Sequence, residues 1–395
     1  MVYLLAAMML IVARPVCAEL TYDVLFKAHF VPEAGKAQAS ITIVQEAGEL
    51  KRLDLAAPGE IYSHFAGTGE IRRSDDRVIW NVPEDGGTLS YSVAVDHRRN
   101  GAYDARMTPR WAILRLDNLF PPARVRSASG AASRSSVVLS GPVGWRFETR
   151  YGRSHEEVSV SDPRRRFDRP TGWMVAGELG IRRDTIAGRA VSVAAPVGQG
   201  FRRVDVLAFL RWTLPDLAAV FPGLPDRLLI VGAGESMWRG GLSGPESLYL
   251  HVGRPLISEN GTSTLLHELV HIATAASRSP GDDWIREGLA EYYSLEMLRR
   301  SGGISQARFD GALASLAAWA ERDGGRLADP STGPHTAYAA VVFHQIATEL
   351  RGAGGSLDAV VSELVTGGGL DRGSLLALLE STLKEPPEAL AHLYR

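Results

Sequence analysis

The amino-acid sequence predicts an α+β protein in which an antiparallel, sandwich-like β domain precedes a mainly helical domain. Two observations carry this prediction. Up to about residue 200, short segments alternate apolar and polar residues with a period of two, which is typical of strands. Beyond that point the apolar residues recur with helical spacing. A chain of 395 residues that is 45% apolar and 22% charged can also bury more than one large core.

The N-terminal segment, residues 1–18, is predicted to be a signal peptide. Residues 2–13 form an uninterrupted apolar run, which is too short to cross a bilayer. Small residues at Val16 and Ala18 suit cleavage after Ala18. Cleavage would remove Cys17, the only cysteine, so we expect an exported protein without disulfides, periplasmic in a bacterium or secreted. Lipidation of Cys17 is the alternative, although RPVC is a poor lipobox.

The β-rich domain is expected to span residues 19–200. Its alternating segments are rich in Val, Ile, Tyr and Phe and are separated by Gly, Pro and Asp, a pattern that favours antiparallel strands in a sandwich or barrel. The predicted strands are LTYDVLFKAHF, QASITIVQ, RVIWNVP, LSYSVAVD, SSVVLSG and GRAVSVAAPVG.

The helical domain is expected to span residues 201–395. It begins with a helix in VDVLAFLRWTLPDLAAVF, and a strand pair follows at RLLIVGAG and ESLYLHVG, the second of which is expected to be an edge strand. Charges interrupt the apolar faces of the later helices, so no membrane span is expected there. These helices are predicted at 260–277, 283–301, 305–322, 334–351, 356–366 and 373–394.

The pentapeptide HELVH at residues 267–271 predicts a metal site on the first of these helices. At a spacing of four, His267 and His271 lie one turn apart on the same face, where two imidazoles can bind one zinc ion. Glu268 lies beside them and could take a proton from a metal-bound water. The alternative is an ordinary buried helix, since buried histidines are often only hydrogen-bonded. A third ligand decides between the two interpretations.

Glu287, on the next predicted helix, is the candidate for that third ligand. A loop containing Pro280 turns the chain back, so the two helices can lie antiparallel with Glu287 opposite the histidines. Two histidines, one glutamate and an open position form the catalytic rather than the closed structural pattern of zinc coordination. Gly288 is expected where the two metal-bearing helices pack closely. Glu291 either accepts the second ring N–H of a ligand histidine or is a solvated glutamate.

At these residues the sequence resembles a known family. HELVH followed by WIREGLAEYYSLEMLRRSG is similar to the gluzincin metallopeptidases, most of all the glycyl aminopeptidase family and more distantly the large zinc aminopeptidases. The resemblance covers about residues 200–395 and implies a thermolysin-like catalytic domain with one zinc ion per chain. It also places Tyr338 as the donor that steadies the developing oxyanion, with Tyr292, Tyr293 and His335 as substitutes.

The sequence departs from this family in four places, one of which is the setting of Tyr338: the family has Y-x-K-G there, whereas Tyr338 is followed by Ala339, Ala340 and Val341. The spacing between His271 and Glu287 is shorter than in the large aminopeptidases, and the chain lacks the PDZ domain of the glycyl aminopeptidases. GGLSGPES stands where the large aminopeptidases have the G-x-M-E-N element that holds a substrate's free amine, which leaves exopeptidase action open. The same place in the sequence makes Gly241 and Ser247 candidates for binding the substrate.

The function predicted from these residues is zinc-dependent hydrolysis of peptide bonds in a peptide or protein substrate. A net charge of -2 gives no general attraction to nucleic acid or to an anionic membrane. The alternative is a non-catalytic exported binding protein in which the zinc helix pair is structural, although such a site has no use for Glu268. Substrate preference and oligomeric state are not specified by the sequence.

Overall fold

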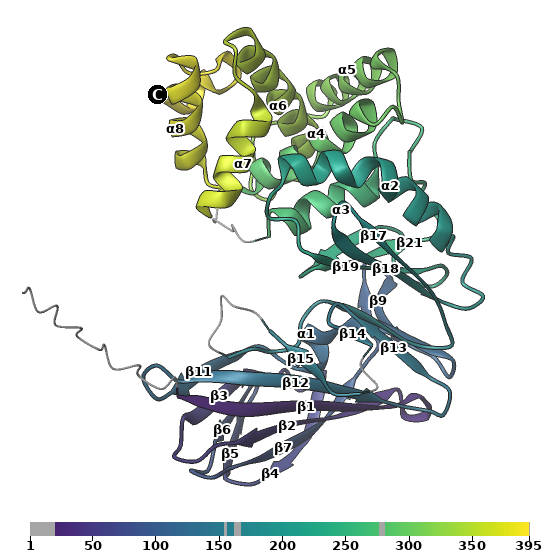
Figure 1. Cartoon of the computed structure of the whole chain (residues 1–395), viewed down its shortest axis with the longest axis vertical. Coiled ribbons are helices and arrows are strands. Elements are labelled where there is room, and N and C mark those ends of the chain that lie inside the picture. The colour runs from purple at the N-terminus through teal and green to yellow at the C-terminus, as the bar shows by residue number, and fades with distance from the viewer. Residues whose placement is uncertain (1–19, 154–155, 162–166, 276–280, 395) are drawn as a thin grey trace, which may run out of the picture.

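The computed structural model describes residues 20–153, 156–161, 167–275 and 281–394, and its architecture is α+β, as expected. Strands occupy one end of the molecule and helices the other, with one further sheet between them (Figure 1). The predicted signal peptide and Cys17 lie outside the described residues. In the described ranges, every helix is too short or too polar to cross a membrane.

Three sheets build the strand-rich end, in the orders β15-β12-β1-β2-β7-β4, β11-β3-β6-β5 and β14-β13-β16-β10-β9-β8. Most neighbours are antiparallel, but β1 pairs in parallel with β12, so the expectation of a wholly antiparallel arrangement is wrong. The strands are β1 (Thr21–Val31), β2 (Lys36–Val44), β3 (Leu50–Ala56), β4 (Tyr62–Gly67), β5 (Glu70–Ser74), β6 (Arg77–Asn81), β7 (Gly86–Ala94), β8 (His97–Arg99), β9 (Ala102–Met107), β10 (Trp111–Arg115), β11 (Ala123–Ser127), β12 (Ala132–Ser140), β13 (Arg146–Thr149), β14 (Gly152–Arg153), β15 (Val158–Val160) and β16 (Trp173–Gly177).

Strand β10 shows how the layers are joined, because both of its faces are buried. Successive side chains of a strand point to opposite faces. Ala112 and Leu114 pack into the core of the strand-rich end, whereas Trp111 and Ile113 pack against the sheet that lies between this end and the helices. The sheet that contains β10 is therefore a shared wall between two hydrophobic cores.

The sheet between the two ends has the order β17-β18-β19-β21-β20. Its strands are β17 (Leu179–Ile186), β18 (Arg189–Pro196), β19 (Arg227–Ala233), β20 (Gly241–Gly244) and β21 (Ser247–His251). β18, β19 and β21 are parallel, and β17 and β20 are antiparallel edges. The segment GRAVSVAAPVG, expected in the β-rich domain, is thus β18 of this sheet. The boundary between the predicted domains 19–200 and 201–395 falls between β18 and β19, which pair in this one sheet. A boundary before β17 would keep all five strands of the sheet together.

ESLYLHVG was expected to be an edge strand, and this is wrong. It forms β21, which lies between β19 and β20, because the short segment Gly241–Gly244 folds back as a hairpin and covers its outer side. β20 is therefore the edge of the sheet on the side of the helices that carry the histidines and Glu287.

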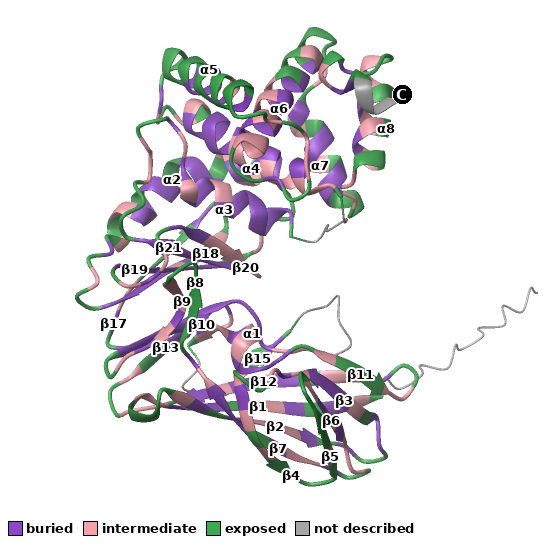
Figure 2. Ribbon diagram, turned by 180° about the vertical axis from the view of Figure 1, so that it is seen from behind, coloured by how far each residue is buried: buried purple, intermediate pink, exposed green. Residues whose placement is uncertain are grey.

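All but the last of the helices after residue 260 form within about four residues of their predicted bounds. The last was predicted at 373–394, and its end is wrong: the helix stops at Leu383, before Pro386 and Pro387, which cannot continue a helix. Buried residues of α3 and α4 share one core with the inner face of the sheet, whereas much of α5 is exposed (Figure 2). The helices are α1 (Leu116–Leu119), α2 (Arg203–Val220), α3 (Thr264–Ala273), α4 (Asp283–Arg300), α5 (Gln306–Arg322), α6 (Pro334–Gly352), α7 (Leu357–Gly367) and α8 (Arg372–Leu383), with short 3-10 helices at Pro32–Ala34 and Glu388–Tyr394.

Candidate metal centre

Helix α3 carries His267, Glu268 and His271. It begins after Ser263, whose hydroxyl accepts a hydrogen bond from the backbone N–H of Leu266 at 3.4 Å. Such an N-cap stabilises a helix by about 1 kcal/mol relative to alanine. Six apolar side chains of the helix are buried in the core of the helical end and fix its rotation about its own axis: Leu265, Leu266, Leu269, Val270, Ile272 and Ala273. The two histidines are thereby turned toward α4.

Helix α4 places Glu287 and Glu291 one turn apart, facing the histidines. Gly288 was expected at the contact between α3 and α4, and this is wrong. A methyl group at Gly288 would lie 2.7 Å from Cβ of Ala339 and 2.9 Å from a ring carbon of Phe343, so the glycine lets α6 approach α4. The reason is geometric, since one step along a helix rotates a side chain by about 100° away from its predecessor.

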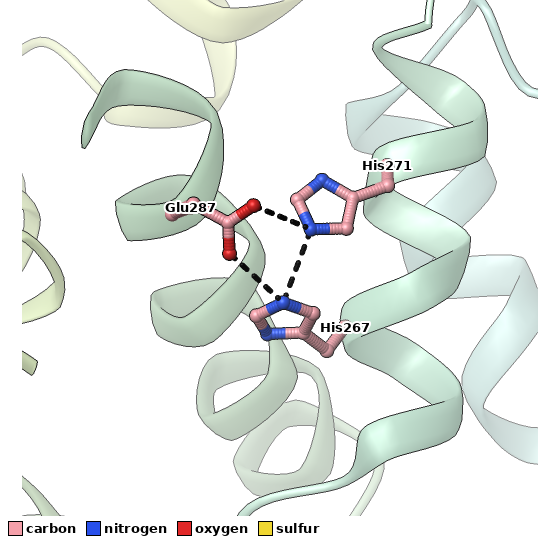
Figure 3. A group of neighbouring side chains, drawn as sticks. All are labelled: His267, His271 and Glu287. Atoms are coloured by element: carbon pink, nitrogen blue, oxygen red, sulfur yellow. Dashed lines mark hydrogen bonds and ion pairs between the residues drawn. The ribbon is translucent and has the colours of Figure 1, made fainter. Parts of the chain in front are cut away.

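The three predicted ligands converge between the two helices (Figure 3). Nε2 of His267 and Nε2 of His271 are 3.1 Å apart. Oε1 of Glu287 lies 3.2 Å from Nε2 of His271, and Oε2 lies 3.4 Å from Nε2 of His267. Two rings and one carboxylate from two helices therefore present one ligand atom each to a common point.

These separations suit a tetrahedral metal ion. Zinc bonds of 2.0–2.1 Å at tetrahedral angles place neighbouring ligand atoms about 3.3 Å apart. The observed values lie between 3.1 and 3.4 Å. Two imidazole nitrogens and a carboxylate oxygen are also the donor set that zinc prefers in catalytic sites, where a fourth position stays open. The residues present fit zinc without any change of fold.

Glu291 orients the ring of His267. Nδ1 of His267 donates to Oε2 of Glu291 at 3.0 Å, which directs Nε2 toward Glu287 and His271, where it can bind a metal ion once its proton is lost. Of the two interpretations in the sequence, the structure thus favours the histidine partner over the solvated glutamate. Burial opposes charging of the His267 ring, but hydrogen bonds to Glu287 and Glu291 outweigh it and raise the pKa of His267 to about 10. Burial opposes ionisation of Glu287, but hydrogen bonds to His267 and His271 outweigh it and hold the pKa of Glu287 below its usual range.

In the metal-free protein we expect one imidazole to stay charged up to about pH 10. Because the pKa of His267 is raised to about 10, its proton is held at neutral pH, and zinc must displace it. Zinc affinity should therefore fall as the pH falls. A histidine NMR titration of the metal-free chain measures the midpoint, which Glu291→Gln should lower. Titration of all ten histidines below pH 8 would contradict this account.

The side chain of Glu268 contacts the edge strand β20. A methyl group at Gly241 would lie 2.7 Å from Cγ and 3.0 Å from Oε1 of Glu268, and 2.7 Å from Cγ2 of Thr264. Only 8% of Glu268 is exposed, and its carboxylate makes no hydrogen bond with the described residues. The backbone at Gly241 therefore forms a wall against a buried carboxylate that is free to accept a proton.

Gly241→Ala is expected to lower turnover by about 100-fold while zinc stays bound, because displacing a reacting group by about 1 Å can have an effect of that size. The added methyl group must push Glu268 or the strand aside, whereas it touches none of the three ligands. Turnover is compared with metal content for Gly241→Ala and for Gly311→Ala, which adds the same group in open space on α5. Equal turnover in the two variants would rule out this role for Gly241.

Not every predicted site residue lies at the centre. Ser247 is fully buried. Its hydroxyl accepts a hydrogen bond from the backbone N–H of Trp173 at 2.8 Å and donates one to the carbonyl of Pro245 at 2.8 Å. Ser247 therefore links two sheets and does not face a substrate. Tyr338 is partly buried on α6, and its hydroxyl makes no hydrogen bond with described residues.

The substitutes for Tyr338 have structural partners. The hydroxyl of Tyr293 donates to Asp358 at 2.8 Å, and Tyr292 is 2% exposed beside it. Nδ1 of His335 accepts from the backbone N–H of Arg326 at 3.2 Å. We therefore keep Tyr338 as the proposed donor and set these three aside.

The fold and the centre define a chain in which two histidines and a glutamate from adjacent helices converge, beside a buried glutamate that contacts an edge strand. No protein-family model and no curated protein matches the sequence. Its fold is similar to a solved structure described as an aminopeptidase N family protein from Idiomarina loihiensis, with a TM-score of 0.68, 14% identity, and coverage of 94% of this chain and 73% of that chain. At this identity the likeness establishes the fold alone.

Proposed function

We propose that this chain is a zinc-dependent peptidase in which His267, His271 and Glu287 hold the ion and Glu268 is the general base. The observation that carries the proposal is the convergence of two Nε2 atoms and one carboxylate at 3.1–3.4 Å from one another. The neighbouring carboxylate of Glu268 has no hydrogen-bond partner among the described residues. The peptidase-like fold supports a peptide substrate. A purely structural ion would need no such second carboxylate.

When zinc is bound there, it lowers the pKa of a bound water to near 7 and polarises the carbonyl to be attacked. The residues of the chain supply the rest. Glu268 accepts the proton of the attacking water and returns it to the nitrogen of the leaving amine, so the carboxylate ends each cycle unchanged. Glu291 keeps the ring of His267 in the tautomer whose Nε2 is free to bind the ion.

The edge strand β20 is placed to hold the substrate. It ends the sheet, so its outer backbone groups face away from β21, and an extended peptide can pair with such an edge. Gly241 brings this edge into contact with Glu268. A peptide on β20 would then pass the general base. Tyr338 is the proposed donor to the oxygen on which negative charge develops, a contribution of about 3 to 4 kcal/mol for a well-placed donor.

A mixture of peptides incubated with the purified protein is expected to be cleaved, and a zinc chelator should abolish cleavage. Zinc held by three protein ligands is required both to activate the water and to polarise the carbonyl. Mass spectrometry identifies the products, and adding back zinc should restore at least the original rate. Cleavage that survives complete zinc removal would contradict the proposal. A zinc-loaded protein that cleaves no peptide would favour the non-catalytic alternative.

A further inference from the structure

Strands β8 and β9 carry a group of arginines stacked on aromatic rings beside the loop that leads into β20. The guanidinium carbons of Arg98 and Arg106 lie 4.5 Å and 4.6 Å from the ring centroid of Tyr103, and that of Arg99 lies 5.2 Å from the ring of Trp238. We refer to Arg98, Arg99 and Arg106 as the arginine cluster. Stacking on aromatic faces holds these long side chains in place.

The arginine cluster is joined to the edge strand by direct contacts. The backbone N–H of Tyr103 donates to the carbonyl of Ser236 at 3.2 Å, and that of Trp238 donates to the carbonyl of Tyr103 at 2.7 Å. The ring of Trp238 covers Gly240 so closely that a methyl group there would lie 1.9 Å from it. Gly241, the next residue, touches Glu268. The chain of contacts therefore runs from Arg99 through Trp238 and the two glycines to the proposed general base.

The cluster has no carboxylate partners among the described residues. Arg98 donates to the hydroxyl of Tyr103 and the carbonyl of Gly101. The nearby carboxylates are already engaged elsewhere: Asp104 with His97, Glu235 with Arg239, and Asp96 with the backbone N–H of Met107. The arginine cluster thus leaves a concentration of positive charge near the start of β20, although the net charge of the chain is -2.

The cluster also borders open space. Arg106 lines a cavity of about 560 Å³ whose walls include Arg110, Glu235 and Ser236. A carboxylate entering there meets the guanidinium group of Arg106, which is ordered by its stacking on Tyr103, and Arg recognises carboxylates with paired N–H donors.

Building on the proposed peptidase function, we propose that the arginine cluster binds a carboxylate of the substrate and makes the chain selective for acidic peptides. Summed over these contacts and the Cα–Cα step from Gly240 to Gly241, the path from Glu268 to Arg99 is roughly 10–15 Å long, which corresponds to about three to five residues of an extended peptide. The carboxylate is supplied either by an acidic side chain at that distance from the scissile bond or by the C-terminus of a short peptide. Both sources present the same group to the same guanidinium groups.

The test is a series of otherwise identical peptides, each with Glu or Gln at one position. With amidated C-termini, the series measures the contribution of the acidic side chain to kcat/KM. Comparison of free with amidated C-termini measures the contribution of the terminal carboxylate. We expect Glu, or a free terminus, about three to five residues to one side of the scissile bond to raise kcat/KM by about fivefold to tenfold, mainly through KM. Raising the ionic strength should reduce this preference, because exposed charges are screened.

Arg99→Gln and Arg106→Gln should remove the preference, so that kcat/KM for the acidic peptides falls to the value for the neutral ones. Arg124→Gln is the matched control, since Arg124 is exposed on β11 and has no carboxylate partner among described residues. A cluster that only fastened β8 and β9 to the loop would lower stability without changing the ratio of acidic to neutral substrates. Equal rates for all Glu and Gln peptides, or a preference that survives both substitutions, would overturn the proposal.

Peptide binding separates this inference from the proposed function. Fluorescence anisotropy of acidic and neutral peptides on the zinc-loaded Glu268→Gln variant needs no turnover. If the chain cleaves nothing but binds acidic peptides through Arg99 and Arg106, the peptidase proposal fails and the cluster stands. If it cleaves neutral and acidic peptides alike and binds them alike, the cluster proposal fails and the peptidase stands. Should a variant fail to fold, the ionic-strength dependence of wild-type selectivity decides.

Discussion

Glu268→Gln is expected to lower kcat by about 1,000- to 10,000-fold while the zinc content stays at one ion per chain. Gln has the same shape as Glu but cannot take a proton from water, and general acid–base catalysis contributes effects of up to this size. Glu268 makes no hydrogen bond with the three proposed ligands, so their geometry should survive. Steady-state kinetics and metal analysis of the same preparation give both numbers.

Glu259→Gln is the matched control for this variant, because Glu259 is an exposed glutamate in the loop before α3. It should retain full activity. Undiminished turnover in Glu268→Gln would refute its role as general base. Loss of zinc together with turnover would show instead that Glu268 supports the ion.

Glu287→Gln is expected to lower zinc affinity by more than about 100-fold, and Glu291→Gln by about 10- to 100-fold, the range typical of residues that orient a metal ligand. Glu287 offers an oxygen to the ion itself, with Oε1 and Oε2 at 3.2 and 3.4 Å from the two Nε2 atoms, and an amide is a much weaker ligand than a carboxylate. Glu291 instead acts through Nδ1 of His267. Competition with a chromogenic chelator measures both constants.

The order of the two effects is the decisive result. An equal or larger loss in Glu291→Gln than in Glu287→Gln would mean that the assignment of ligand and orienting residue is reversed. Activity of each variant at saturating zinc provides a second check, since Glu291→Gln should recover most of its turnover once the ion is supplied in excess.

Features set by local sequence were predictable here. The capped start of α3, the spacing of His267 and His271, and Glu287 one helix later follow from side chains that are close in sequence and from helical geometry. The distances between these ligands then follow from the packing of α3 on α4, which the apolar residues of both helices specify.

Features set by pairing between distant segments were not predictable. The parallel pairing of β1 with β12 and the position of β20 outside β21 depend on backbone hydrogen bonds that leave no periodic pattern in the sequence. Gly288 illustrates the same limit, because its neighbour proved to be Ala339 of α6. The contact of Gly241 with Glu268 joins a strand to a helix, and only the resemblance to a family had pointed to that glycine.

The most direct test of the central claim is a crystal structure of the zinc-loaded chain with an anomalous difference map at the zinc edge. The account predicts one peak between α3 and α4, within about 2.0 to 2.2 Å of Nε2 of His267, Nε2 of His271 and an oxygen of Glu287, with water at a fourth position. Absence of a peak there at saturating zinc, or a fourth protein ligand that closes the site, would contradict it.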